Sequence, residues 1–339
     1  MEAVILVGGQ GTRLRPLTLS TPKQMLPIMG IPMIEAVLRQ LARHGVTEAV
    51  FSLGYLPDAF LEAYPDGHCA GVSLHYAVEP EPLDTAGAVR FAAEVLEPTE
   101  TFVVVNGDVL TDLNLTELVG FHKASGAQGT IALHPVEDPS QFGVVPTKDD
   151  GQVIEFVEKP GADAPTNLIN AGTYVFEPSV LERVPLGVKT SIERKTFPEM
   201  VVDGALFAMA DSSYWLDAGT PKAYLQAHAD FLSGRRTSDV YDARLSNSSY
   251  LIEGCHVDSA AIITSSVIDR GCVVEAGATI IDSVLLPGTI VRSGARIEGS
   301  ILGARSEIGA SAVIGPTTVI GFDEIIEAGA SFTDARVPS

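Results

Sequence analysis

The first two-thirds of the chain alternate short apolar runs with segments of helical periodicity. The apolar runs are Ala3–Val7, Ala49–Leu53, Val72–Val78 and Phe102–Val105, and such runs are typical of buried parallel strands. Helical spacing begins after Pro32 and returns over Thr85–Val95. The apolar positions of the first helix fall on one face and end before Gly45; they are Ile34, Val37, Leu38 and Leu41. This alternation predicts an α/β domain with a mainly parallel sheet between helices.

From about residue 251 the apolar period changes to six. One series is Ile262, Ile268, Val274, Ile280 and Leu286, and after a slip of four residues a second is Leu302, Ile308, Ile314, Ile320 and Ile326. Glycine follows four of these residues, giving Gly303, Gly309, Gly315 and Gly321. A six-residue period fits neither a helix nor an ordinary strand and is typical of hexapeptide-repeat coils that stack as a triangular parallel β-helix. We therefore expect a domain over 1–233, a polar linker over 234–250, and a solenoid of about four coils of roughly 18 residues over 251–339.

Composition narrows the class of protein. The chain has 339 residues, 46% apolar and 19% charged, which is enough for two hydrophobic cores. Apolar runs stay below the roughly 18–20 residues of a membrane span, and the first residues lack the pattern of a signal peptide. The three scattered cysteines, Cys69, Cys255 and Cys272, fit neither a disulfide framework nor a zinc site, so we expect a reducing, cytoplasmic setting.

The net charge of −21 argues against nucleic-acid polymers and anionic membranes as partners. A nucleotide can still bind, because a few placed cations and backbone N–H groups act locally. Gly8–Arg13 follows the first apolar run, and its glycines allow the backbone to approach phosphates. The loop matches neither a P-loop nor a dinucleotide fingerprint. Arg13, Arg15 and Lys23 add cations within eleven residues, suited to the charge of a transferring phosphoryl group. Arg15 reads equally well as a surface cation.

The run GGxGTRLRPLT followed by Pro22-Lys23 resembles the signature of sugar-1-phosphate nucleotidyltransferases. The resemblance continues along nearly the whole chain. It implies a Rossmann-like catalytic domain followed by a left-handed parallel β-helix, and transfer of a nucleotidyl group from an NTP to a sugar-1-phosphate with release of pyrophosphate. Its implied nucleotide-binding residues are Leu6, Gly8, Gly9, Gly11, Thr12, Arg13, Leu83, Thr85, Ala86, Gly87, Asn106 and Gly107.

The same resemblance assigns the metal, the catalytic groups and the sugar pocket. It implies a Mg²⁺ site built from Asp108, which ends an apolar strand, and Asp217, which precedes a helix. Two carboxylates with phosphate oxygens and water suit that ion. Arg13 and Lys23, together with Asp108, are the implied catalytic residues. The implied sugar-phosphate residues are Gly143, Glu158, Lys159, Asn170, Ala171 and Gly172. Glu158 and Lys159 directly follow an expected strand over Val153–Val157.

The finer motifs are most similar to mannose-1-phosphate guanylyltransferases, among them VEKP, INAGTYVFEP and WLDAGTPKAY. This favours GTP and mannose-1-phosphate, with UTP or dTTP and glucose-1-phosphate as the competing pair. Two positions depart from the guanylyltransferase pattern. Gln24 stands where those enzymes usually have proline, and Asp84 replaces the glycine of a base-binding PLGTAG turn, where a side chain could reshape the loop.

Two other classes of protein share parts of this pattern. Hexapeptide-repeat acyltransferases usually need a catalytic histidine, and His256 is the sole histidine after residue 228. Non-catalytic relatives typically lose phosphate-loop or metal residues, whereas Arg13, Lys23, Asp108 and Asp217 are all present. A short solenoid leaves strand edges open, so we expect a homo-oligomer formed through the C-terminal domain.

Overall fold

The computed structural model describes residues 1–236, 245–246 and 248–338, and its contacts divide the chain into two compact units. The sheet unit comprises Met1–Gly9 and Ile34–Trp215, and the solenoid unit comprises Gln10–Met33 and Leu216–Ser339. Much of the expected linker, residues 237–244 and 247, lies outside the described residues. The domain boundaries expected from sequence therefore stay a prediction.

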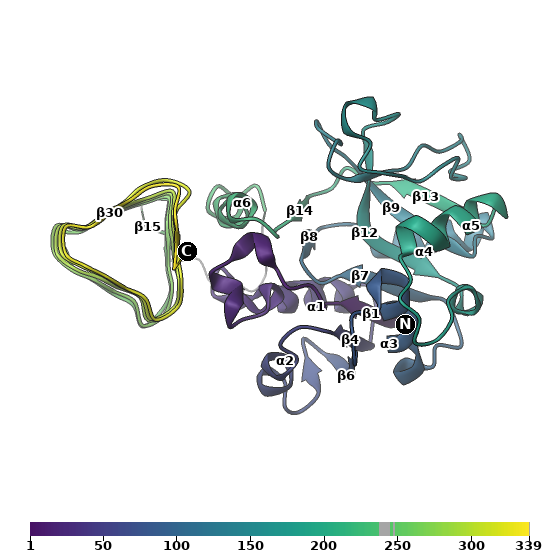
Figure 1. The fold of residues 1–339 in the computed structure, drawn as a ribbon, viewed down its shortest axis with the longest axis horizontal. Coiled ribbons are helices and arrows are strands. Elements are labelled where there is room, and N and C mark those ends of the chain that lie inside the picture. Colours follow the sequence, from purple (N-terminus) through teal and green to yellow (C-terminus); the bar gives the residue numbers. More distant parts are fainter. Residues whose placement is uncertain (237–244, 247, 339) are drawn as a thin grey trace. The chain divides into compact units, whose positions relative to one another are not determined.

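A mixed sheet forms the sheet unit (Figure 1). Its strands are β1 (Glu2–Leu6), β4 (Glu48–Leu53), β5 (His68–Cys69), β6 (Val72–Val78), β7 (Phe102–Asn106), β9 (Gly129–Pro135), β10 (Gly143–Val144), β11 (Val157–Glu158), β12 (Leu168–Phe176) and β13 (Leu206–Ala210). The main path runs β11-β10-β12-β7-β1-β4-β6-β5, with β9 on β12 and β13 on β9. Strands β7, β1, β4 and β6 are mutually parallel, as expected, whereas β12 joins β7 in the antiparallel sense.

Helices cover this sheet and supply its core. They are α1 (Met33–Arg43), α2 (Asp58–Ala63), α3 (Asp84–Leu96), α4 (Leu115–Ser125), α5 (Phe197–Val202) and the π-helical turn η6 (Ile192–Thr196). The 3-10 helices η4 (Gly161–Asp163) and η5 (Pro178–Arg183) and the short strand β8 (Val109–Thr111) lie in the same part of the chain. The four apolar positions expected on one face of the first helix are all buried in α1. Helix α3 places Val89 and Ala92 in one cluster with Val4, Val50 and Val104. Helical periodicity therefore identified both helices.

One expected strand is wrong. The run Val153–Val157 does not form a continuous strand: Val153 makes an isolated bridge to Thr147, and pairing resumes at β11 (Val157–Glu158). Ile154 is 53% exposed while Val153 and Phe156 are buried, so the side chains do not alternate as a strand requires.

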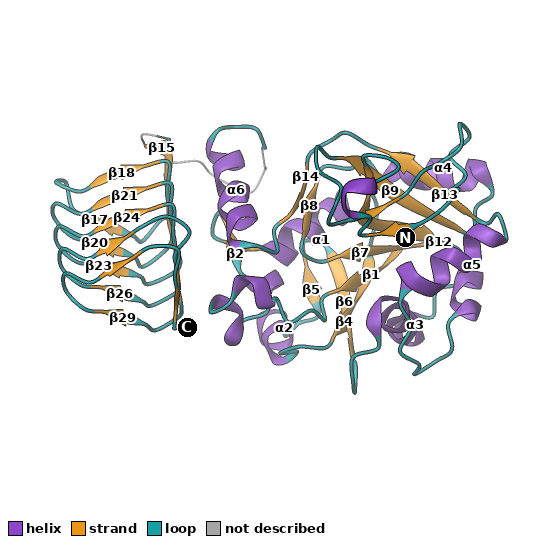
Figure 2. Ribbon diagram, turned by 45° about the horizontal axis from the view of Figure 1, so that its top comes forward, coloured by secondary structure: helices purple, strands orange, loops and turns teal. Residues whose placement is uncertain are grey.

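In the solenoid unit, triangular coils stack along one axis, as Figure 1 shows end-on and Figure 2 from the side. One face holds β16 (Ser249–Leu251), β19 (Val267–Ile268), β22 (Val284–Leu285), β25 (Ile301–Leu302), β28 (Val319–Ile320) and β31 (Arg336–Val337), with β15 (Leu245–Ser246) antiparallel at its edge. The second face holds β17 (His256–Val257), β20 (Val273–Val274), β23 (Ile290–Val291), β26 (Glu307–Ile308) and β29 (Ile325–Ile326). The third holds β18 (Ile262–Thr264), β21 (Thr279–Ile281), β24 (Arg296–Glu298), β27 (Val313–Ile314) and β30 (Ser331–Phe332).

The coil length explains the slip in the six-residue period. Val267 pairs with Val284 and Val284 with Ile301, so these coils have 17 residues, while the next step, from Ile301 to Val319, has 18. Inward residues therefore recur at steps of six, six and five: Ile263, Ile268, Val274, Ile280, Leu285, Val291, Ile297 and Leu302. Ile262, expected in the core, points outward and is 60% exposed, because Ile263 takes the inward position. Two of the faces have five strands each, so the solenoid has five rungs there rather than the expected four or so.

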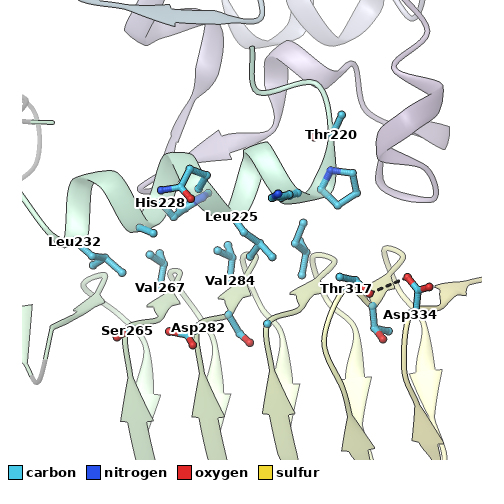
Figure 3. Close-up of a pocket in the computed structure, with 18 of the residues that line it drawn as sticks. Thr220, Leu225, His228, Leu232, Ser265, Val267, Asp282, Val284, Thr317 and Asp334 are labelled. Carbon is cyan, nitrogen blue, oxygen red and sulfur yellow. Dashed lines mark hydrogen bonds between the residues drawn. The ribbon is translucent and has the colours of Figure 1, made fainter. Parts of the chain in front are cut away.

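The first face is covered within the solenoid unit. Its outward residues Val267, Val284, Ile301 and Val319 are all at most 2% exposed. Helix α6 (Pro221–Leu232) lies over Val267, Val284 and Ile301 (Figure 3). The segment Gln10–Met33 belongs to the same unit. It contains η1 (Thr12–Leu14), η2 (Leu17–Leu19), η3 (Lys23–Met25), β2 (Pro27–Ile28) and β3 (Ile31–Pro32). Arg270 donates from Nη2 to the Gly30 carbonyl at 2.8 Å, and the Tyr224 hydroxyl donates to the Pro27 carbonyl.

Among the described residues, the helices are too short or too polar to cross a membrane.

The coil glycines allow a test of this stacking. A Cβ on Gly303 would lie 2.4 Å from the Gly321 backbone, whereas a Cβ on Gly120, an exposed residue of α4, would meet open space. We expect Gly303→Ala to lower the free energy of unfolding by about 1–3 kcal/mol. Gly120→Ala should leave it unchanged or raise it by about 0.5–1 kcal/mol. Chemical denaturation followed by circular dichroism measures both. Equal effects of the two changes would contradict the close coil stacking.

Candidate active site

The carboxyl ends of β1 and β7 lie side by side. Leu6 is the register partner of Asn106, and Gly107 donates its N–H to the Leu6 carbonyl at 3.0 Å. A Cβ on Gly107 would lie 2.6 Å from Val7 Cγ1, so a glycine is needed for this approach. The expected nucleotide residues Leu6, Gly8 and Gly9 therefore share one sheet edge with Asn106, Gly107 and the metal candidate Asp108, as parallel pairing requires.

Gly8 lies against the end of the neighbouring strand. Its Cβ position would be 3.4 Å from the Gly54 nitrogen and 3.5 Å from Glu79 Oε1. Glu79 accepts hydrogen bonds from the Ser52 hydroxyl at 2.9 Å and from the Leu83 N–H at 3.0 Å. Glu79 thereby ties the glycine loop to the turn before α3, a role that the sequence did not indicate.

The start of α3 is held from within the sheet unit. The Ala86 and Gly87 N–H groups donate to the Thr190 carbonyl at 2.9 and 3.1 Å, and Thr190 N–H donates to the Leu83 carbonyl at 2.9 Å. A Cβ on Gly87 would lie 2.8 Å from the Val188 carbonyl oxygen. Three expected nucleotide residues, Leu83, Ala86 and Gly87, are thus buried with these backbone groups bonded to the protein. Their predicted contacts to the nucleotide stay predictions.

Thr85 connects the same turn to η6. Its hydroxyl donates to Glu193 Oε2 at 2.8 Å and accepts from the Ile192 N–H at 2.9 Å, and Ser191 Oγ donates to the same Glu193 oxygen. Asp84 has a φ of 61°, the left-handed conformation that glycine adopts easily. The aspartate therefore occupies the conformation expected of the glycine that it replaces, and its carboxylate accepts the Thr85 N–H at 2.8 Å.

The expected sugar residues Asn170, Ala171 and Gly172 form a bulge in β12. Pairing with β9 shifts register between Asn170 and Tyr174, and Gly172 has a φ of 74°. Asn170 Oδ1 accepts the Gly172 N–H at 3.0 Å, while its Nδ2 donates to the Tyr174 hydroxyl at 2.9 Å. Burial raises the pKa of Tyr174, which keeps the phenol neutral. A Cβ on Gly172 would lie 2.6 Å from Asn106 Nδ2, so the bulge lies against the end of β7.

Trp215 lies against this bulge, although the sequence pattern assigned it no role. Its Nε1 donates to the Ala171 carbonyl at 2.9 Å. The ring stacks on His134 with centroids 5.5 Å apart and meets Phe142 edge-on at 5.8 Å. An aromatic wall therefore adjoins the bulge, an arrangement suited to the apolar face of a sugar ring.

Gly143, Glu158 and Lys159 come together through the short β10–β11 ladder, where Gly143 is the register partner of Glu158. Lys159 Nζ lies 3.7 Å from Glu158 Oε1, and the lysine side chain is 63% exposed. Lys159 also has a φ of 50°, and its N–H donates to the Phe142 carbonyl. This left-handed conformation is unfavourable for lysine and is frequent at functional positions.

The other phosphate-loop residues belong to the solenoid unit. Gly11, with a φ of 60°, begins η1, and its carbonyl accepts the Thr18 hydroxyl at 2.8 Å. A Cβ there would lie 3.0 Å from Thr18 Cγ2 and 3.2 Å from Lys23 Cβ. Gly11 therefore lets the loop close against Lys23, while Thr12 and Arg13 are exposed.

Arg13 and Asp217 meet within this unit. Arg13 Nη2 lies 3.4 Å from Asp217 Oδ2, and Asp217 Oδ1 accepts the Gly219 N–H at 2.9 Å. The arginine side chain is 58% exposed, so the pair contributes little to stability. The ion pair instead places the Arg13 guanidinium beside the Asp217 carboxylate, a candidate metal ligand. Arg15, the third cation, is 3.5 Å from Gln10 Oε1.

Gln24 is 1% exposed, and its Oε1 has no hydrogen-bond partner among the described residues. A buried, unsatisfied amide oxygen beside Lys23 is energetically unfavourable.

The donor set can be compared with the needs of a metal ion. The described residues hold no cluster of three or more His, Cys, Asp or Glu side chains of the kind that encloses a metal alone. Asp108 is partly exposed at the edge of the β7 strand and Asp217 is 27% exposed. One or two accessible carboxylates, with the remaining positions left to phosphate oxygens and water, are the set that Mg²⁺ uses with nucleotides. The residues present fit such an ion.

Residues 2–234 match the family model described as nucleotidyl transferase, and residues 245–337 match the one described as the GMPPB C-terminal domain. The chain therefore belongs to the nucleotidyl transferase family. Members of this family generally use a divalent metal ion.

Among similar proteins is a mannose-1-phosphate guanylyltransferase of Mycobacterium tuberculosis, 42% identical over 236 residues, which are 69% of this chain and 65% of that protein. A mannose-1-phosphate guanylyltransferase catalytic subunit beta of Dictyostelium discoideum is 38% identical over 78% of this chain and 73% of its own. The alignment thus spans a little under two-thirds of the first relative. A crystal structure of HddC from Yersinia pseudotuberculosis has a TM-score of 0.60 and 30% identity, covering 68% of this chain and 99% of that one.

Proposed function

We propose that this protein transfers a guanylyl group from GTP to mannose-1-phosphate. In the reaction, a phosphate oxygen of the sugar phosphate attacks the α-phosphorus of the nucleotide. The bond from that phosphorus to the bridging oxygen of the β-phosphate breaks, and pyrophosphate leaves with the bond's electron pair. The products are a nucleotide sugar and pyrophosphate, and no side chain of the protein becomes covalently attached.

One observation carries the proposal. The register that sets Leu6 opposite Asn106 places the glycine loop beside Asp108, and the Gly172 bulge lies against Asn106. Candidate nucleotide and sugar residues therefore meet at one sheet edge. Direct transfer requires this juxtaposition, because both substrates must be bound together.

The cations supply the electrostatic part of the mechanism. Arg13 and Lys23 supply positive charge for the triphosphate of the bound nucleotide. Negative charge grows there on the transferring group and on the leaving pyrophosphate. A Mg²⁺ ion held by Asp108 and Asp217 would add neutralising charge and orient the phosphate oxygens. Glu158 accepts hydrogen bonds from sugar hydroxyls, Lys159 pairs with the sugar phosphate, and Trp215 lines the sugar pocket.

The choice of base and sugar rests on the relatives and on the second domain. Proteins about 40% identical to this chain are named as mannose-1-phosphate guanylyltransferases, and the C-terminal residues match a domain model named for one of them. Glucose-1-phosphate with UTP or dTTP is the second candidate. It is favoured by Gln24 and Asp84, the two departures from the guanylyltransferase pattern.

A matrix assay tests this choice. Initial pyrophosphate release is measured for GTP, UTP, dTTP, ATP and CTP, each with mannose-1-phosphate and with glucose-1-phosphate. We expect GTP with mannose-1-phosphate to give the highest kcat/KM, about 10–100-fold above other pairs, because each unpaired buried hydrogen-bonding group costs about 1–3 kcal/mol. A preference for UTP or dTTP with glucose-1-phosphate would reject the substrates while leaving the reaction class in place.

The metal assignment has its own test. Asp108→Asn removes a carboxylate charge with little change of shape, and we expect kcat for pyrophosphorolysis to fall by about 10²–10³-fold. The Mg²⁺ concentration for half-maximal rate should rise. Asp149→Asn, at an exposed loop carboxylate, is the matched control and should behave like the parent. Undiminished activity of Asp108→Asn at every Mg²⁺ concentration would show that Asp108 does not hold the metal.

We place the reaction in a reducing compartment, the cytoplasm. The three cysteines of the described chain are all free thiols, as expected where disulfides do not form. The net charge of −21 supports small anionic substrates held by local cations rather than a nucleic-acid partner.

We infer that copies of the chain associate through the solenoid. Its third face carries the exposed aliphatic side chains Ile262 and Val313, which are 60% and 41% exposed, and exposed apolar groups on a strand face favour pairing. Light scattering after gel filtration should therefore give a multiple of 35.7 kDa.

The variant Ile262→Asp/Val313→Asp should reduce that mass, because charges on the face oppose its burial. Val202→Asp alters an 86% exposed valine of the sheet unit and should not. A mass of one chain for the parent at micromolar concentration would refute the association.

A further inference from the structure

A pocket in the solenoid unit lies between α6 and the first face of the β-helix. Its volume is about 480 Å³. Leu225 and Leu232 project from α6 toward Val267 and Val284 of the coils (Figure 3), and Ile301 continues the same wall. This volume falls within the roughly 300–1,000 Å³ of pockets that hold small organic ligands. The α6 pocket is distinct from the candidate active-site residues.

The end of the α6 pocket nearest Thr220 is polar and carries two cations. Lys222 and Arg336 line it, and Arg336 Nη1 donates to the Thr317 carbonyl at 2.6 Å. Asp334 is also present, with Oδ1 accepting the Thr317 hydroxyl at 2.8 Å (Figure 3). Helix α6 begins here, adding the partial positive charge of its N-terminus. Two cations and a helix start against Asp334 make this end locally positive in a chain of net charge −21. The other carboxylate that lines the pocket, Asp282, lies nearer its middle (Figure 3).

The shape and the charge limit the occupant. Aliphatic side chains on both walls favour a flat apolar body, while the positive end favours a single anionic group. A space of about 480 Å³ is too small for a helix or a folded partner. We propose that the α6 pocket is a regulatory site for a small amphipathic organic anion, which inserts its apolar body beside Leu225 and directs its anionic group toward Lys222 and Arg336.

A ligand in the α6 pocket would affect the candidate metal residue Asp217 through α6. Thr220 caps this helix by accepting the Ala223 N–H on its hydroxyl, and Asp217 lies three residues earlier, held by Gly219 and beside Arg13. A ligand that fixes α6 against the coils fixes the Asp217 backbone at the same time. We expect occupancy to change the metal requirement of the reaction. This coupling rests on the proposed role of Asp217, whereas binding in the pocket does not.

The probe is 8-anilinonaphthalene-1-sulfonate, an aromatic body with one sulfonate, titrated into the full-length protein and followed by its fluorescence. Lys222→Glu reverses a charge at the polar end. Ala229→Trp adds bulk at the rim from an exposed position that contributes no core packing. Lys123→Glu and Ala124→Trp, exposed positions of α4, are the matched controls. Circular dichroism confirms that each variant is folded.

We expect saturable binding at one site per chain, weakened at least tenfold by both pocket variants and unchanged in both controls. Saturating probe should also shift the Mg²⁺ concentration for half-maximal pyrophosphorolysis at least threefold in the parent and not in Ala229→Trp. Binding that is absent, or equal in all four variants, overturns the site. Site-specific binding without a shift in the Mg²⁺ requirement overturns the regulation. Because fluorescence reports binding without turnover, an inactive protein would count against the proposed function and not against the site.

Discussion

The parallel pairing of β1 with β7 is the constraint on which the candidate site depends. With Leu6 opposite Asn106, both strands end at the same level, and the residues that follow emerge at one edge. The approach is close enough that Gly107 admits no side chain, since a Cβ would lie 2.6 Å from Val7. If β7 shifted by one residue relative to β1, the side chains of β7, Asn106 among them, would point to the other face of the sheet. The sheet register thus determines which polar groups the substrates can meet.

The solenoid unit adds a second constraint. Its first face presents an apolar row that water would otherwise cover, and α6 lies over Val267, Val284 and Ile301 of that row. The same helix begins just after Asp217, and Arg13 of the glycine loop contacts that carboxylate. The β-helix therefore supports the helix that directly follows Asp217, which gives a physical reason for a repeat domain in a nucleotidyl transferase.

Local patterns predicted most of the fold. Helix α1 and strands β4 and β6 follow directly from the spacing of their apolar residues, and the six-residue period identified the solenoid. The period failed where a coil has 17 residues, since a step of five between Ile263 and Ile268 moves Ile262 to the surface. The segment Val153–Val157 is not a continuous strand because its backbone bonds are divided: the Val153 N–H donates to the Leu206 carbonyl and the Ile154 N–H to the Pro146 carbonyl. No local pattern records such a change of partner.

The candidate site was predicted in part, and for a similar reason. Motif residues such as Asp108, Asn170 and Glu158 could be proposed as site residues because the family signature lies in contiguous sequence, and their roles stay predictions. Glu79, Glu193 and Trp215 were missed because their roles arise from contacts across the fold; Thr85 and Glu193 are 108 residues apart. The sequence around a glutamate does not show that its carboxylate accepts a hydrogen bond from a hydroxyl far away in the sequence.

In the proposed reaction the protein positions two substrates for direct transfer and supplies no nucleophile of its own. Stereochemistry at the α-phosphorus tests it directly. With the Sp isomer of GTPαS and mannose-1-phosphate, the configuration of the nucleotide-sugar product is read by ³¹P NMR against standards of both diastereomers. A single in-line displacement inverts that centre, and inversion is the result that this account predicts. Retention would contradict it, because retention requires two displacements through a covalent nucleotidyl–protein intermediate.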